Sequence, residues 1–131
     1  MSSAQPFIGI DVAKEYLDMA SRPGGQPTRT RNREAEIAQL VQDLQERRPA
    51  LIVLEATGGL ELPLAAALAV AGLPVAVVNP RQVRSFAQAT GQLAKTDRLD
   101  AQLLAHFAEA IRPAPRALPD AQTQQFSALL A

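Results

Sequence analysis

Short apolar runs alternate along the chain with segments in which apolar residues recur every third or fourth position. Such runs are typical of buried strands, and the longer period is typical of helices that pack on one side. The apolar runs and two alternating segments predict strands over residues 7–12, 15–20, 28–33, 51–54 and 74–78. The helical period predicts helices over residues 34–47, 60–71, 80–89 and 97–111.

Turn and capping residues separate these elements. Residues 22–27 (Arg-Pro-Gly-Gly-Gln-Pro) have the composition of a turn. Asn32, Asn79 and Thr96 are expected to cap the starts of helices, and Gly72 is expected to end one. A meander of three strands followed by alternating strands and helices predicts an α/β fold, with a mixed sheet and helices on its faces.

The chain changes character near its C-terminal end. Residues 112–119 (Arg-Pro-Ala-Pro-Arg-Ala-Leu-Pro) have the composition of a linker, and residues 121–131 begin another amphipathic pattern. That pattern breaks off without a partner, as expected for a piece of a longer protein. We therefore expect one domain over residues 1–112. Residues 113–131 are expected to form a linker and the start of a helix that frays or packs against a second copy.

Composition excludes several classes of function. Lys plus Arg and Asp plus Glu number 13 each, so electrostatic binding must come from local clusters. The chain has no Cys and one His, which excludes disulfides, thiol nucleophiles and zinc sites built from histidines. It has no signal-like start and no apolar run of about 18 residues. We expect a cytoplasmic protein without a membrane partner, whose chemistry depends on carboxylates.

Four carboxylates have positions that favour a site. Asp11 and Glu55 each end an apolar run, which places them at the carboxyl edge of the sheet. If their strands are neighbours, the two groups face each other across about 5 Å and repel unless a cation lies between them. Asp97 and Asp100 are expected to share the inward face of a helix. An all-oxygen site of this kind suits Mg²⁺ or Mn²⁺.

Each acid also has an ordinary structural explanation. Asp is common in turns at strand ends, and acids in the first turn of a helix suit its dipole. Glu55 could cap the helix that follows it. Any one acid fits either explanation, and the combination of four favours a functional site.

Three blocks of sequence resemble a known family. They are residues 9–14 (Gly-Ile-Asp-Val-Ala-Lys) with Leu17-Asp18, residues 54–59 (Leu-Glu-Ala-Thr-Gly-Gly) and residues 95–101 (Lys-Thr-Asp-Arg-Leu-Asp-Ala). In this order and spacing they resemble the DEDD transposases of insertion-sequence family 110, over residues 6–111. The resemblance implies a ribonuclease-H-like (RuvC-like) fold. It also implies that the catalytic, metal-binding tetrad is Asp11, Glu55, Asp97 and Asp100.

The resemblance also implies a function. Members of this family are DNA recombinases that insert and excise a mobile element, work as homo-oligomers, and are guided by a structured RNA that the element encodes. They carry a C-terminal domain with a catalytic serine. None of the five serines here matches that motif: Ser2, Ser3, Ser21, Ser85 and Ser127. The chain by itself is therefore expected to be inactive in recombination.

Basic residues near these blocks are candidates for binding nucleic acid. Arg29, Arg31 and Arg33 alternate, so on a strand they would share one face, either as a solvated surface or in contact with phosphates. Lys14 follows Asp11 closely and could approach a phosphate. A second group lies between the last predicted strand and the acidic helix, where only Asp97 opposes it. Its members are Arg81, Arg84, Lys95 and Arg98.

Three hypotheses of different class follow. The leading one is the metal-binding, nuclease-like domain of a DNA recombinase. The second is a non-catalytic nucleic-acid-binding and assembly module with a structural carboxylate cluster. The third is half of a kinase-like or actin-like ATPase. It ranks last, because the Gly-Thr phosphate turn it needs after Asp11 is replaced by Val-Ala-Lys.

Overall fold

A computed structural model of the chain describes residues 5–24, 26–92 and 99–117. Apart from the start of the last helix, the helices and strands agree with the sequence prediction to within two residues at each end. In chain order they are β1 (Phe7–Val12), β2 (Tyr16–Arg22), β3 (Thr28–Arg31), α1 (Glu34–Arg47), β4 (Leu51–Glu55), α2 (Leu62–Val70), β5 (Val75–Val78), α3 (Pro80–Ala89) and α4 (Ala101–Ile111).

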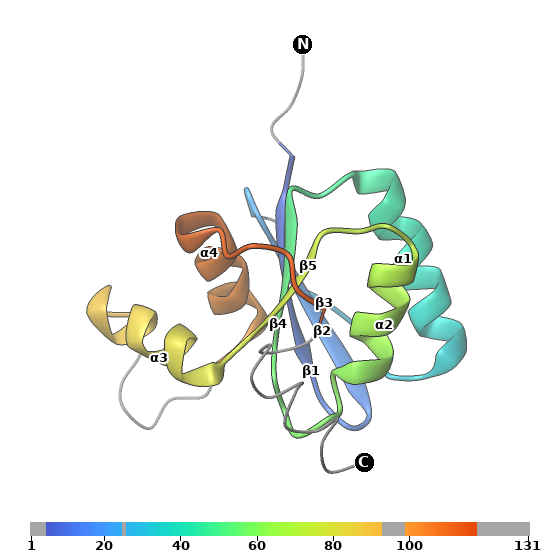
Figure 1. Cartoon of the computed structure of the whole chain (residues 1–131), viewed down its shortest axis with the longest axis horizontal. Coiled ribbons are helices and arrows are strands. Elements are labelled where there is room, and N and C mark those ends of the chain that lie inside the picture. Colours follow the sequence, from blue (N-terminus) through green and yellow to red (C-terminus); the bar gives the residue numbers. More distant parts are fainter. Residues whose placement is uncertain (1–4, 25, 93–98, 118–131) are drawn as a thin grey trace.

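The five strands form one mixed sheet in the order β3-β2-β1-β4-β5. β1 pairs antiparallel with β2, and β2 pairs antiparallel with β3, as a meander requires. β4 runs parallel to both β1 and β5. The sheet is seen nearly edge-on in Figure 1, with α1 and α2 on one side and α3 and α4 on the other. The expectation of a mixed sheet with helices on both faces is therefore confirmed.

One face of the sheet packs on α1 and α2 through large aliphatic side chains. Because side chains alternate along a strand, β1 and β4 each send every second residue to this face. The cluster includes Ile8, Ile10, Ile52, Leu54, Leu40, Leu44, Leu64 and Leu68, all buried.

The other face packs on α3 and α4. Large apolar residues such as Val53, Leu104 and Phe107 form one cluster there, and small residues line the contact of α4 with β1 and β2. Ala20 on β2 forms a buried cluster with Ala101 and Ala105 of α4. At Gly9 on β1, a Cβ atom would collide with backbone atoms of Ala101 and Ala105. The backbones of β1 and α4 are therefore in direct contact, which only a glycine on the strand permits.

The helix ends depart from the sequence prediction at two positions. Arg33, rather than Asn32, is the residue before α1, and its side chain makes no capping hydrogen bond. The side-chain Nδ2 of Asn32 donates instead to the carbonyl of Ala13 at 2.8 Å, which ties the β1–β2 turn to the end of β3. The prediction at Asn79 is confirmed, since its Oδ1 accepts from the backbone N–H of Arg81 at 2.8 Å.

The second departure is at the start of α4, which begins at Ala101 rather than at residue 97. Asp100 has extended backbone angles and caps the helix, accepting from the N–H of Leu103 at 2.9 Å. A short acidic side chain binds exposed helix N–H groups more readily than it joins the helix. The prediction that Asp100 lies on an inward helix face is therefore wrong. Thr96 and Asp97 lie outside the described residues.

Beyond α4 the chain returns to the sheet. The N–H of Arg116 donates to the carbonyl of Val75 at 2.6 Å, and its carbonyl accepts from the N–H of Val77 at 2.8 Å. Part of the predicted linker is thus attached to the outer edge of β5. The boundary at residue 112 stays a prediction, and residues 121–131 lie outside the described part. Of the helices that the structure describes, none has the length and hydropathy to cross a membrane.

Candidate active site

A buried carboxylate and a partly buried one end adjacent parallel strands at the carboxyl edge of the sheet. The parallel register of β1 and β4 ends at Ile10 and Leu54, so Asp11 and Glu55 follow as the next pair. Alternation along both strands places these two side chains on the α4 face. Asp11 is only 8% exposed, and the Oε2 atom of Glu55 is buried. The condition that the sequence left open, that the two strands are neighbours, is met.

Helix α4 directs its N-terminus toward this edge. It runs antiparallel to β1, since the guanidinium of Arg112 lies 4.9 Å from the Phe7 ring centroid and the first turn contacts Gly9 further along the strand. Asp100 precedes that first turn and therefore lies toward the carboxyl end of β1. One oxygen of Asp100 is occupied by its cap to Leu103.

The donor types at this edge suit a divalent cation. Carboxylate oxygens are the ligands that Mg²⁺ and Mn²⁺ prefer, and two adjacent carboxylates shielded from solvent favour a cation between them. Among the residues that the structure describes, no three His, Asp or Glu side chains are grouped so that they could hold a metal ion. The tetrad with Asp97 thus stays a prediction, of which Asp11 and Glu55 form the adjacent pair.

A further carboxylate, Asp18, faces Asp11 across the β1–β2 register. Arg29 donates to both of its oxygens, at 2.7 and 3.1 Å, and lies 4.7 Å from the Tyr16 ring centroid. The hydrogen bond and the charge of Asp18 raise the pKa of the Arg29 guanidinium, and the charge of Asp11 adds a smaller effect. Sequence reasoning missed this arrangement, although counting back from the turn pairs residue 18 with residue 11.

Glu61 is a second acid that the sequence did not single out. It is only 2% exposed and lies just before α2. Its Oε1 accepts from the backbone N–H of Thr57 at 2.9 Å, the hydroxyl of Thr57 at 3.3 Å and the N–H of Gly59 at 3.1 Å. These bonds order the loop that directly follows Glu55, so the buried charge of Glu61 is compensated locally.

The candidate basic residues occupy different surroundings. Arg31 ends β3, whereas Arg33 lies beyond the strand, so the prediction that the three arginines share one strand face is wrong. The chain has already turned toward α1 at that point. Lys14 is exposed in the β1–β2 turn. Arg81 and Arg84 lie in α3, which starts at the carboxyl end of β5. Lys95 and Arg98 lie outside the described residues.

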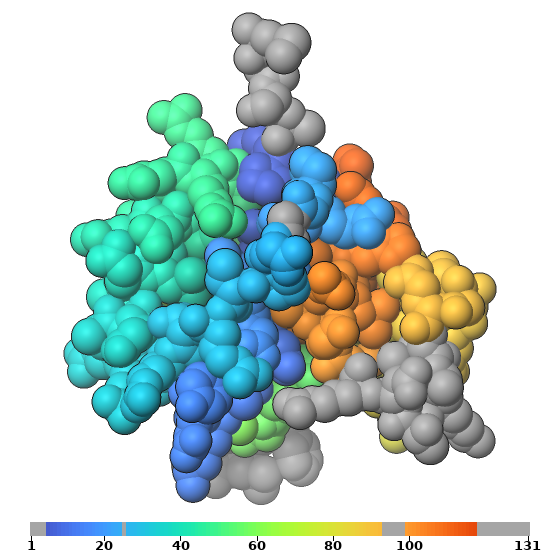
Figure 2. All heavy atoms as spheres, turned by 180° about the vertical axis from the view of Figure 1, so that it is seen from behind, coloured from blue at the N-terminus to red at the C-terminus, as the bar shows by residue number. Residues whose placement is uncertain are grey.

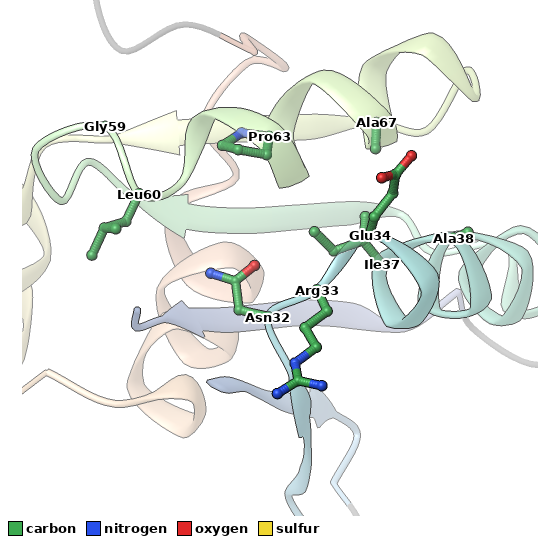
Figure 3. A pocket seen from close by; sticks show the side chains of 9 residues that line it. All are labelled: Asn32, Arg33, Glu34, Ile37, Ala38, Gly59, Leu60, Pro63 and Ala67. Atoms are coloured by element: carbon green, nitrogen blue, oxygen red, sulfur yellow. The ribbon is translucent and has the colours of Figure 1, made fainter. Parts of the chain in front are cut away.

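A cavity of about 630 Å³ lies on the opposite face, between α1 and α2. Figure 3 shows it flanked by the first turns of α1 and by the segment that leads into α2. Its lining is mainly apolar and includes Ile37, Leu60, Pro63 and Ala67. Of the candidate tetrad residues that the structure describes, Asp11, Glu55 and Asp100, none lines it, so this cavity is separate from the carboxylate edge.

Comparison of the whole structure defines the class of fold. The chain is similar to RuvC from T. thermophilus in complex with a Holliday junction substrate, with a TM-score of 0.57 and 18% sequence identity. The similarity covers 86% of this chain and 99% of the RuvC chain. The fold is therefore ribonuclease-H-like, of the RuvC type, as expected.

Comparison of the sequence defines the family. Residues 8–131 match the profile of the DEDD transposases of insertion-sequence family 110, described as a transposase, and the chain belongs to this family. No curated protein matches the chain. Family and fold together make it a nuclease-like domain of a transposase. The resemblance read from the three sequence blocks is thereby confirmed.

Proposed function

We propose that this chain is the metal-dependent domain that carries out phosphoryl transfer on DNA during transposition of an insertion sequence. Asp11, Glu55, Asp97 and Asp100 hold Mg²⁺ or Mn²⁺ in this proposal. The observation that carries it is the placement of Asp11, which is buried, and Glu55, whose Oε2 is buried, at the carboxyl ends of adjacent parallel strands. Membership of the DEDD transposase family supports the assignment.

Different residues of the chain have different roles in this proposal. Asp11 and Glu55 place two carboxylates at the edge of the sheet, and the hydrogen bonds of Glu61 to Thr57 and Gly59 order the loop that follows Glu55. Arg81 on α3 brings positive charge to the same edge, where a DNA phosphate would approach. When bound, divalent metals supply activation of a nucleophile and stabilisation of a leaving oxygen.

The partners in this proposal are DNA, a structured guide RNA and further copies of the full-length protein. Family membership and the basic residues at the carboxyl edge support this. In this proposal, residues 1–131 contribute the carboxylates and the basic residues, and recombination additionally needs the serine-bearing C-terminal domain that the resemblance implies.

A metal-dependent thermal shift tests the proposal without requiring activity. A ligand that binds only the folded state at about 100 times its Kd stabilises that state by about 2.7 kcal/mol. For a domain of this size that amounts to a rise in Tm of roughly 10 °C. The rise is expected with Mn²⁺ or Mg²⁺ and should be lost in Asp11→Asn. Asp43→Asn, on the exposed face of α1, is the matched control and should keep it.

The same measurement distinguishes the metal-dependent proposal from the alternative of a non-catalytic assembly module. That alternative is favoured by one observation, namely that no three acids among the described residues are grouped for a metal. If millimolar Mn²⁺ leaves Tm unchanged while the chain still binds nucleic acid, the carboxylates are structural and the metal-dependent proposal is wrong.

A further inference from the structure

A second site lies at the carboxyl edge, where the β1–β2 turn meets the junction of β3 and α1. It is a cavity of about 210 Å³ lined by Lys14, Glu15, Tyr16, Arg31, Asn32 and Arg33. Three of its lining side chains are cationic and one is anionic, in a chain whose formal net charge is zero. We infer that this pocket binds one backbone phosphate of a nucleic acid. The inference rests on the proposed function and specifies a contact that function would use.

The walls of the pocket are held together by hydrogen bonds. The backbone N–H of Asn32 donates to the carbonyl of Glu15 at 2.9 Å, and the Asn32 side chain donates to the carbonyl of Ala13 at 2.8 Å. The turn is closed by a bond from the N–H of Ala13 to the carbonyl of Tyr16, at 2.9 Å. The cations are therefore carried on a prearranged frame, which lowers the entropic cost of binding.

The three cations of the pocket are available to a ligand. Within the described part of the chain, the ion pairs are Arg22 with Glu109 and Arg29 with Asp18, and neither involves a cation of the pocket. Arg29 is thereby excluded from the site, although its spacing in the sequence grouped it with Arg31 and Arg33. A guanidinium matches the geometry of a phosphate well, because its N–H groups can donate in parallel.

The acid next to Arg33 in the chain, Glu34, is directed away from the cations of the pocket. Figure 3 shows the guanidinium of Arg33 extending away from α2, whereas the carboxylate of Glu34 extends toward that helix. Glu34 lines the cavity between α1 and α2 and does not line this pocket. Glu15 is thus the single acid in the wall, opposed by three positive charges.

The position of the pocket connects it with the carboxylates. Lys14 lies three residues after Asp11, so at most about 11 Å of chain separates them. In Figure 2 the β1–β2 turn projects at the lower edge of the molecule, in blue. A nucleic-acid strand with one phosphate in the pocket would therefore hold a neighbouring phosphate near Asp11 and Glu55. The pocket is a positioning contact and takes no part in bond breaking.

The test compares nucleic-acid binding by the intact chain and by a triple variant, Lys14→Gln with Arg31→Gln and Arg33→Gln. The probes are a labelled short DNA duplex, its single strand and an RNA of the same sequence, each measured by fluorescence anisotropy over a salt series. Loss of one phosphate contact should reduce the slope of log K against log salt by about 1. At low salt we expect affinity to fall by about 10-fold.

Two control variants carry the same chemical change elsewhere. Arg47→Gln lies at the far end of α1, and Arg29→Gln removes the arginine already paired with Asp18. Both should leave the slope unchanged. Inorganic phosphate as a competitor distinguishes a free phosphate from a backbone phosphate. If inorganic phosphate binds in the pocket while the affinity of all three oligonucleotides is unchanged by the triple substitution, the assignment of the pocket to nucleic acid is wrong.

A triple variant that melts like the intact chain and binds every probe with unchanged affinity and slope overturns the inference. The metal-dependent thermal shift is measured on the same variant and is expected to persist. If only the pocket inference is wrong, the intact chain still shows the metal-dependent rise in Tm. If the metal proposal is wrong, the intact chain shows no such rise. The two failures are distinguishable in one set of samples.

Discussion

The two faces of the sheet are built differently. On the α1 and α2 face, long aliphatic side chains separate the helices from the strands, and a cavity of about 630 Å³ remains between the two helices. On the α3 and α4 face, Gly9, Ala20, Ala101 and Ala105 bring α4 into direct contact with the strands. Side chains cap α3 and α4 at their N-termini, whereas α1 and α2 begin without such caps.

The difference shows which elements of the fold are held in a fixed relative position. The strand that carries Asp11 and the helix that Asp100 caps meet through backbone contact, so their relative position has little freedom. A site built from groups on separate elements requires such fixed placement. None of the candidate acids that the structure describes, Asp11, Glu55 and Asp100, lies on the α1 and α2 face, and looser packing is sufficient for it.

The largest expected effect comes from filling the contact at Gly9. In Gly9→Val the new Cβ meets backbone atoms of Ala101 and Ala105, which cannot move aside as a side chain can. We expect a loss of stability above the usual range of about 1–3 kcal/mol for overpacking. Ala67→Val, beside the cavity on the other face, should cost less than about 1 kcal/mol. Equal losses in thermal melts would remove the contrast between the two faces.

The next effect compares the same truncation on both faces. Leu104 on α4 and Leu64 on α2 are both fully buried. Because α4 already touches β1, it cannot move closer to fill a cavity, whereas α2 has room to shift. We expect Leu104→Ala to lose about 4 kcal/mol and Leu64→Ala about 3 kcal/mol. Urea unfolding measures both, and a larger loss at Leu64 would reverse the interpretation.

A smaller effect concerns the helix starts. Asp100→Ala removes the cap of α4 and should cost about 1 kcal/mol, whereas Asp100→Asn keeps a capping oxygen and should cost little. Arg33→Ala at the start of α1 removes no capping bond and should cost less than about 0.5 kcal/mol. Chemical denaturation resolves these differences. If Asp100→Asn is as destabilising as Asp100→Ala, the charge rather than the cap holds the helix.

The smallest effect is expected at the ion pair between Arg22 and Glu109, 2.9 Å apart, which joins β2 to α4. Both side chains are more than a third exposed, so solvent weakens the pair. Glu109→Gln should lower stability by less than about 0.5 kcal/mol, and high salt should abolish the difference. Asp43→Asn, which removes an exposed charge from α1 on the other face, should change stability by a similarly small amount. A salt-independent loss at Glu109 would mean that the pair contributes through packing instead.

Much of the fold was predictable because apolar periodicity records burial directly. The buried runs of β1, β4 and β5 predicted buried strands of a mixed sheet, and the position of Asp11 and Glu55 at strand ends followed from them. Whether β1 and β4 are neighbours was left open by the sequence. The role of Asp100 was not predictable in the same way. An acid in the first turn and an acid at the cap have nearly the same apolar spacing after them, and only the backbone angles distinguish them.

The pairing of Asp18 with Arg29 depends on the register of three strands, which composition and period do not specify. The separation of Arg33 from Arg31 depends on where the strand ends, and local spacing could not reveal it. The tight contact at Gly9 likewise arises between elements far apart in the chain. Each of these features is set by tertiary packing, and a single sequence gives it only weak signals.

The two outer strands of the sheet, β5 and β3, differ in the backbone groups that a second copy of the chain could pair with. On β5, the backbone groups of Val75 and Val77 are occupied by Arg116 of the same chain. The opposite border, β3, has four residues and carries two arginines, and short charged borders discourage strand addition. Pairing of one copy's sheet edge with that of another is therefore disfavoured at both borders of the sheet.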